Sequence, residues 1–505
     1  MKAKKVFHNI VASFLSQIVN IVVNIILPPL IIMAYGSKVN GLVSSIKQLM
    51  SYISLVGAGI SIATTQALYK PLAENDKVIT SGMMNAANKM FTKAGSIFSF
   101  LAIIFAFVYP LLIDGEMGYF TIVKLVIVMS IVGSSEFFVV GKFRSLLYAD
   151  QRSYVFSLIQ AAAFLLSFIC TFVFIKLEMS IVLVQFAASF AYIIRIAALY
   201  IYIKKNYGYL DSKVEPIQTV VAKKNDAFIH QLTGLVTLGS QTIILSTFTN
   251  LEIASIYAVY NVVFSGFQSI CSQVVNSISP FFGRNIALSE SEVLRKEFNS
   301  FEFLYSFSIS FLYSVCTVMI VPFISVYIGR DSDINYMNNI VAYLFVIVSF
   351  FTNIRLLSQS VISVAGHFKE TRSRALIEAT LCIVLQLILV KRFGIYGVLI
   401  GSAIALGWRC IDILLYANKY IIKQKNHLTI LRLLKAPIAT ILMIIINFSF
   451  HMSIKNFYDW IIWASINSLL SLVIVFLVNL VLERKKTIYY VDLLKKFIFG
   501  KIKIQ

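Results

Sequence analysis

Charged residues are scarce in this sequence of 505 residues. Asp, Glu, Lys and Arg together make up 13% of it, whereas 59% of the residues are hydrophobic and the mean hydropathy is +0.83. A soluble domain carries roughly 25% charged and about 45–50% apolar residues. Water is therefore not the main solvent of this chain. Because apolar runs recur from one end to the other, no soluble catalytic domain is expected.

The sequence also lacks the motifs of nucleotide and metal chemistry. It holds no G-x-x-x-x-G-K-[ST] loop, which excludes a fused ATPase domain of that type, and no H-E-x-x-H motif. The five cysteines form no C-x-x-C pair and fall in apolar runs, which favours packing over metal or disulfide chemistry. The longest loop on the predicted outer side, near Gly329–Tyr336, is too short for a catalytic domain. We therefore expect no enzyme, no metal and no other cofactor.

Fourteen apolar segments are long enough to cross a bilayer, which takes about 20 residues. Helices are expected, because lipid offers no hydrogen-bond partner to an open strand edge. The fold class is therefore an all-α polytopic membrane protein with about 14 transmembrane helices. The segments are 9–33, 41–68, 91–113, 119–142, 154–176, 180–203, 227–249, 254–279, 301–328, 337–362, 375–392, 396–419, 437–453 and 460–482.

Basic residues outnumber acidic ones, 44 to 23, and their placement predicts the orientation. Most lie at the two ends of the chain and in alternate loops, as the positive-inside rule requires of cytoplasmic regions. Such residues face anionic lipid headgroups, so the net charge of +21 does not indicate nucleic acid. Both termini are predicted to be cytoplasmic. The basic residues in the outer loops are Lys38, Lys176, Arg330, Lys391, Arg392 and Lys455.

Short matches at an offset of 214 to 218 residues indicate an internal repeat. Arg195, Tyr202 and Lys205 reappear at the same spacing as Arg409, Tyr416 and Lys419. A repeat of six spans leaves both copies in the same orientation, as in other parallel-repeat transporters. We predict two six-helix lobes followed by two extra C-terminal helices. The predicted parts are an N-terminal lobe 1–205, a cytoplasmic linker 206–226, a C-terminal lobe 227–420, two additional transmembrane helices 437–482 and a basic cytoplasmic tail 483–505.

Besides the basic residues counted with the loops, six cations lie within predicted spans. Lys93 and Lys124 lie near the ends of their spans and can reach the interface. The other four lie deeper, and a charge near the bilayer centre costs at least about 2.5 kcal/mol. These four cations have two possible roles. They either line a central cavity or form structural ion pairs with Asp412, Glu136 or Glu378. Polar stripes at helical spacing raise the same choice between a cleft and helix–helix hydrogen bonds. Arginine forks suit phosphate oxygens, so the cavity reading favours an anionic substrate. The candidate substrate-binding residues are Lys47, Arg195, Arg355, Arg409, Asn20, Asn24, Gln48, Tyr52, Gln241, Asn261 and Gln268.

Several stretches carry a resemblance to a known family. They are Ala34-Tyr35-Gly36 with Gly41 and Gly57-Ala58-Gly59-Ile60, the run Ser145 to Arg152, the run Phe393 to Val398, and Ile256-Tyr257 with Ser279-Pro280. In these the chain resembles the polysaccharide transporter (Wzx-like O-antigen, capsule or exopolysaccharide flippase) family of the multidrug/oligosaccharidyl-lipid/polysaccharide superfamily.

The resemblance implies a flippase of the bacterial inner membrane. Its substrate would be an undecaprenyl-diphosphate-linked oligosaccharide, moved from the inner to the outer leaflet by alternating access. It also implies H+ or Na+ as the candidate coupling ion and a glycan polymerase as a candidate partner, besides membrane lipids. Two alternatives stay open: a multidrug or lipid II exporter of the same superfamily, and a membrane partner of a glycan polymerase that transports nothing itself.

Overall fold

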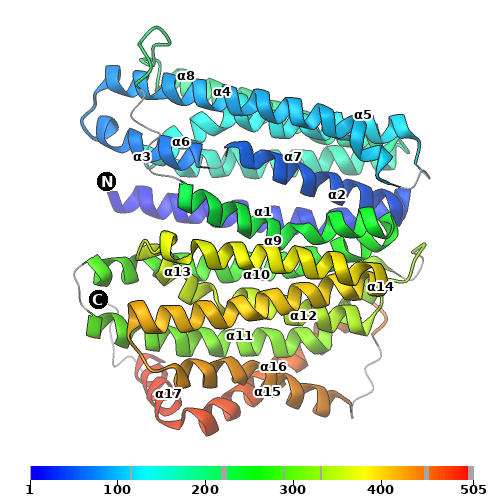
Figure 1. The fold of residues 1–505 in the computed structure, drawn as a ribbon, viewed down its shortest axis with the longest axis vertical. Helices are drawn as coiled ribbons and strands as arrows, with labels where there is room; N and C mark the ends of the chain where they lie inside the picture. The colour runs from blue at the N-terminus through cyan, green and yellow to red at the C-terminus, as the bar shows by residue number, and fades with distance from the viewer. Residues whose placement is uncertain are drawn as a thin grey trace. The chain divides into compact units, whose positions relative to one another are not determined.

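The computed structural model describes residues 2–57, 59–113, 117–217, 225–287, 291–329, 332–448 and 454–498. Across these ranges the secondary structure is entirely helical (Figure 1). The all-α class predicted from hydropathy is confirmed. Parts of the predicted linker and basic tail lie outside the described residues, as do Ala58 of the family-like motif and Arg330 of an outer loop.

Within the described ranges, the first half of the chain runs through nine α-helices, two 3-10 turns and one π-helix. Their bounds are α1 Lys2–Tyr35, α2 Ser37–Ile53, η1 Ser54–Gly57, α3 Ile60–Ala73, α4 Lys77–Val108, η2 Tyr109–Leu111, α5 Tyr119–Ser135, η3 Glu136–Val140, α6 Gly141–Ala149, α7 Ser153–Lys176, α8 Ile181–Asn206 and α9 Asn225–Phe248.

The second half continues in the same way. Its helices are α10 Leu251–Ala287, α11 Ser291–Ile328, α12 Asn339–Ile354, α13 Leu356–Val364, α14 Phe368–Ala417, the π-helix η4 Asn418–Ile422, α15 Asn426–Phe448, α16 Phe457–Leu482 and α17 Arg484–Ile498.

Within the described residues, each of the fourteen predicted spans overlaps with helix, and residues 449–453 of the span 437–453 lie outside the described residues. Eleven segments of the described chain are long and apolar enough to cross a membrane, and the segment Phe368–Ile422 contains two predicted spans. Within it, Gly394 has φ +53°, a backbone conformation that residues with a Cβ rarely adopt, and it separates the two spans. The predicted span 41–68 is likewise broken: α2 ends at Ile53, the 3-10 turn η1 ends at Gly57, and Gly59, at φ +83°, is the N-cap of α3.

The apolar surface of these helices supports the membrane assignment. Many large apolar side chains are exposed along single helices, for example Phe100, Ile103 and Phe107 on α4 and Leu469 and Val473 on α16. In water such faces would be an aggregation hazard, whereas in a bilayer they face the lipid chains. The protein is therefore a multi-pass membrane protein.

The chain divides into two compact units. The N-terminal unit comprises Met1–Val262 together with Ser332–Ile334 and Val390–Ile395, and the C-terminal unit comprises the rest. In the N-terminal unit α7 packs against α1 and α8, α5 packs against α4 and α8, and α2 packs against α1, α5 and α9. In the C-terminal unit α11 packs against α12, α15 and α16.

Candidate functional site

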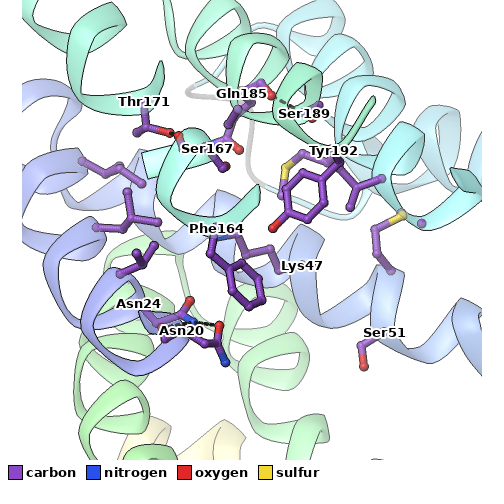
Figure 2. Close-up of a pocket in the computed structure, with 18 residues that line it drawn as sticks. Asn20, Asn24, Lys47, Ser51, Phe164, Ser167, Thr171, Gln185, Ser189 and Tyr192 are labelled. Carbon is purple, nitrogen blue, oxygen red and sulfur yellow. Dashed lines mark hydrogen bonds between the residues drawn. The ribbon is translucent and has the colours of Figure 1, made fainter. Parts of the chain in front are cut away.

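A cavity of about 390 Å³ lies inside the N-terminal unit, among α1, α2, α5, α7 and α8 (Figure 2). We call it the lysine cavity, because Lys47 is the one charged residue in its described lining. The remaining polar side chains of the lining are amides and hydroxyls. They belong to Asn20, Asn24, Ser51, Ser167, Thr171, Gln185, Ser189 and Tyr192.

Lys47 lies in α2, on a helix whose other face is buried. Its neighbours Val43, Ile46 and Met50 belong to the main apolar core of the N-terminal unit, whereas Lys47 itself is exposed. Among the described residues no carboxylate lies within ion-pairing distance of its amine. An amine held inside a membrane helix bundle is expensive to keep charged, and intramembrane charges of this kind typically mark a substrate or ion pathway.

The two asparagines of α1 line the same cavity one helical turn apart. The Nδ2 of Asn24 donates to the side-chain oxygen of Asn20 at 2.7 Å and to its backbone oxygen at 2.8 Å. Figure 2 shows this pair at one end of the cavity, Gln185 and Thr171 at the other, and Lys47 between them. The cavity therefore offers one cation surrounded by neutral groups that both donate and accept hydrogen bonds.

A second cavity of the N-terminal unit, of about 970 Å³, contains Arg195, and we call it the arginine cavity. Arg195 of α8 donates to the Gln160 oxygen at 2.6 Å and to Glu136 at 3.3 Å. Glu136 in turn pairs with Arg144 of α6 at 2.6 Å. The cluster holds two arginines and one carboxylate, so it keeps a net positive charge.

The two cavities share Val132 and Gly133 of α5 in their linings, so they adjoin at this point of the helix. A side chain at Gly133 would meet the ring of buried Phe98 at 2.3 Å. The next turn of the helix is the π-helix that begins at Glu136, and π-bulges occur frequently at functional sites.

Arg355 and Arg409 lie in a corresponding cluster of the C-terminal unit. Arg355 donates to Glu378 at 2.7 Å, and Arg409 pairs with the same carboxylate at 3.2 Å and with Asp412. Arg374 pairs with Asp412 as well. These are the pairs that the sequence offered as the alternative to cavity lining.

The two clusters contain Arg195 and Arg409, which match each other in the repeat predicted from the sequence. They differ in their access to solvent. The side chains of Glu136 and Arg144 are 30% and 34% exposed, whereas those of Glu378 and Arg355 are 9% and 8% exposed. The N-terminal cluster therefore opens onto a cavity at Glu136 and Arg144, whereas in the C-terminal cluster Arg355 and Glu378 are buried and the side chain of Arg374 is 37% exposed.

The remaining candidates are held elsewhere. Tyr52 donates to the backbone oxygen of Val236 at 3.4 Å, and a Cβ at Gly239 would lie 1.9 Å from the Gln48 amide nitrogen. Both side chains thus face α9 and not the lysine cavity. Gln241 is buried and donates to its own helix at Thr237.

Asn261 and Gln268 on α10 are half-buried and belong to the lining of neither cavity. Of the eleven candidates, the structure therefore brings together Asn20, Asn24 and Lys47 in one cavity, and Arg355 and Arg409 in one cluster.

Several lining residues were not among the predicted ones. Gln185 and Tyr192 of α8 and Ser167 of α7 line the lysine cavity, and Arg144 pairs with Glu136 beside the arginine cavity. Gln185, Ser189 and Tyr192 recur at steps of four and three along one helix face, a polar stripe like those read on other spans. That stripe is the signal that could have found them.

Comparisons with known proteins match in structure but not in sequence. No family model matches the chain, and no curated protein matches it. A lipid II flippase, MurJ, in an inward closed conformation is similar over 96% of this chain and 99% of its own, with a TM-score of 0.67 and 16% identity.

Two multidrug transporters have related structures. The match to an inward-facing MATE family transporter of the MOP superfamily covers 82% of this chain and 97% of that transporter's chain, with a TM-score of 0.62 and 11% identity. The MATE multidrug transporter DinF-BH covers 83% and 97%, with a TM-score of 0.57 and 16% identity. The chain therefore has the fold of these flippase and transporter structures. None of the three is named as an enzyme, in agreement with the prediction.

Proposed function

We propose that this protein is a flippase of the bacterial inner membrane for an oligosaccharide linked to a polyprenyl diphosphate, with both termini in the cytoplasm. The observation that carries the proposal is the lysine cavity, where the amine of Lys47 is exposed among amides and hydroxyls and no carboxylate is in the described lining. A cationic group in a neutral polar cavity attracts an anion, and it repels a cationic compound.

The size of the cavity limits what it can hold. About 390 Å³ is at the low end of ligand pockets and accommodates a phosphate or diphosphate group, not a whole lipid-linked oligosaccharide. We infer that Lys47 contacts the diphosphate, while the prenyl chain stays in lipid and the sugars occupy wider polar space. The adjoining arginine cavity, of about 970 Å³ and with a net positive cluster, is suited to the same anion at another stage of its passage.

We expect a smaller contribution to substrate binding from the three arginines Arg195, Arg355 and Arg409 than from Lys47. Each is already paired with a carboxylate, so an incoming phosphate would have to displace a partner from it. Arg195 is the best placed of the three, because its cluster opens onto a cavity. H+ or Na+ coupling and a glycan polymerase partner remain part of the proposal as implied by the family resemblance.

The comparisons favour two alternative substrates. The MurJ structure supports lipid II itself, and the MATE structures support small-molecule export. A drug exporter for cationic compounds would need a carboxylate where the lysine cavity has Lys47, which is why the lipid-linked anion is preferred. A non-transporting partner of a polymerase has no comparable use for an interior cavity.

The test is the leaflet location of the diphosphate-linked oligosaccharide in cells with and without this gene. The deletion should accumulate the intermediate on the cytoplasmic side, the wild-type gene should restore its export, and Lys47→Gln should not. Lys47→Arg keeps the charge and should retain part of the activity. Lys124→Gln is the matched control, because Lys124 is an exposed lysine of α5 outside both cavity linings.

An unchanged distribution in the deletion strain would reject the flippase. Export of lipid II, or of cationic dyes, by the purified protein in vesicles would then select between the alternatives. Full activity of Lys47→Gln, with protein at the wild-type level, would reject the lysine cavity as the site even if the flippase assignment stands.

A further inference from the structure

A strongly basic hollow of about 910 Å³ lies in the C-terminal unit, where α11 and α15 begin and the chain leaves α14. Its lining contains Arg295, Lys296, Lys423 and Lys425, against one carboxylate, Glu292. That carboxylate is 92% exposed and stands 4.0 Å from Arg295, too open to neutralise it effectively. The hollow therefore carries a net charge of about +3 at neutral pH.

The backbone around the hollow adds to this charge. Helix α11 begins at Ser291 and α15 at Asn426, and residues of both first turns line the hollow. The free N–H groups and the positive dipole ends of two helices thus border one space, which is the arrangement that binds phosphate groups in many proteins. The four basic side chains, not the helix ends, identify the hollow as a binding site.

The route of the chain into the hollow has an unusual conformation. The π-helix η4 ends α14, and Lys423 follows it with φ +57° and ψ +45°, in the left-handed region that glycine favours. Residues with a Cβ rarely adopt this conformation, because the Cβ lies too close to the following carbonyl oxygen. A glycine would fit this turn without strain, so the lysine at this position points to a role for its side chain.

Two polar residues of the lining, Gln424 and Asn299, are held in place by hydrogen bonds. Gln424 donates to Asn418 at 2.8 Å, and Asn299 accepts from Arg432 at 2.6 Å and from Lys486 at 2.5 Å. These bonds connect the lining of the hollow to the buried charged residues where α15 begins and α16 ends. The backbone that carries the basic side chains is therefore fixed by these bonds, although the charged ends of those side chains are exposed.

We propose that this hollow is a binding site for a phosphate- or diphosphate-bearing anion, separate from the transport cavities of the N-terminal unit. Its four basic side chains outnumber its one carboxylate, so the hollow attracts anions. The planar guanidinium of Arg295 can bind two phosphate oxygens at once. Among the described residues, the lining contains no Phe, Tyr or Trp on which bases could stack, which disfavours a nucleic acid. The charge distribution of the loops places the hollow on the cytoplasmic side, where both soluble phosphates and anionic lipid headgroups occur.

The experiment uses the full chain in nanodiscs of phosphatidylcholine, and calorimetric titration with inorganic diphosphate. A parallel arm measures the retention of phosphatidylglycerol by native mass spectrometry after mixed-lipid nanodiscs are opened. The test variant is Lys423→Gln/Lys425→Gln. Its matched control is Lys204→Gln/Lys205→Gln, which removes the same charge from exposed lysines at the end of α8.

Losing two of the four cations should weaken binding by about tenfold, which corresponds to about 1.4 kcal/mol, or about 0.7 kcal/mol for each exposed lysine. Loss of diphosphate binding in the test variant alone supports a soluble phosphate as the ligand. Loss of phosphatidylglycerol retention alone, with no diphosphate binding in the wild type, supports a lipid headgroup.

Equal losses in test and control variants, or no binding of either probe to the wild type, would overturn the proposal. Arg295→Gln, on a different helix, should reproduce the effect and guards against a local folding defect at Lys423. Lys47→Gln should remove only the diphosphate binding of the lysine cavity and should keep the component that Lys423→Gln/Lys425→Gln removes, which keeps this result distinguishable from the fate of the proposed transport function.

Discussion

The carboxylates Glu378 and Glu136 offer a direct test of how the two arginine clusters differ. Glu378→Gln would leave Arg355 without its carboxylate in a closed environment, while Arg409 would keep Asp412. Removing one partner of a buried ion pair costs about 3–5 kcal/mol, because the remaining charge is desolvated and uncompensated. We expect a loss of about 3 kcal/mol in the free energy of unfolding, or roughly a hundredfold in the ratio of folded to unfolded protein.

Glu136→Gln is the matched substitution in the N-terminal unit. It also separates a carboxylate from two arginines, but the side chains of Glu136 and Arg144 are about a third exposed to the arginine cavity. Water can replace the lost partner of Arg144, whereas Arg195 is only 4% exposed and keeps the Gln160 oxygen at 2.6 Å. The cost should therefore lie between the value for a solvated pair, about 0–1 kcal/mol, and that for a buried one, about 3–5 kcal/mol. Glu378→Gln should therefore be the more destabilising of the two isosteric changes, because among the described residues the Arg355 side chain donates to no other group, whereas Arg195 keeps Gln160.

Denaturant unfolding of the purified variants in one detergent measures this difference. A double variant, Arg355→Met/Glu378→Gln, removes the stranded cation and should be more stable than Glu378→Gln alone. The reasoning would be refuted if Glu136→Gln destabilised the protein as much as Glu378→Gln, or if the double variant lost the sum of both single effects.

Three further outcomes are expected. Burial, and after it the charge of Arg432, lowers the pKa of Lys486 to about 8, so its protonated form is disfavoured by folding; stability should rise between about pH 8 and pH 10.5, a trend that Lys486→Gln should lack and that thermal unfolding of both proteins would detect. Burial raises the pKa of Glu483, but hydrogen bonds from Arg432 and a neighbouring lysine outweigh it and lower the pKa overall, so stability should fall as the pH drops below about 4.5 and Glu483→Gln should unfold at a lower temperature at neutral pH. Gly41→Val should disrupt the contact of α2 with α10, because a Cβ would lie 1.9 Å from the carbonyl oxygen of the first residue of α10; a wild-type thermal midpoint together with wild-type transport would contradict this.

The helical fold was readable from the sequence because its cause is local. Each apolar run must satisfy its own backbone hydrogen bonds in lipid, so the run itself specifies a helix of spanning length. The break at Gly394 was predicted, because it lies between the spans 375–392 and 396–419, whereas the break before Gly59 inside the span 41–68 was not. Whether a glycine continues a helix or reverses it depends on what packs around it.

The candidate site was only partly readable. Sequence spacing put Asn20 and Asn24 on one face of α1, and both line the lysine cavity with Lys47. Spacing also put Gln48 on the polar face of α2, yet its amide lies against α9. Whether a row of polar residues faces a cavity or a neighbouring helix depends on the rotation of its helix about its own axis. The spacing of the residues does not determine that rotation.

The sequence by itself determined that this is a helical membrane protein with intramembrane cations, since hydropathy and charge are properties of single segments. Which cations are neutralised was decided only by the tertiary structure. Arg195 finds Gln160 and Glu136 on other helices, 35 and 59 residues away, whereas Lys47 meets no carboxylate among the described residues. The physical reason is that an ion pair requires charged atoms within about 4 Å, and helices distant in sequence reach that separation only by packing together.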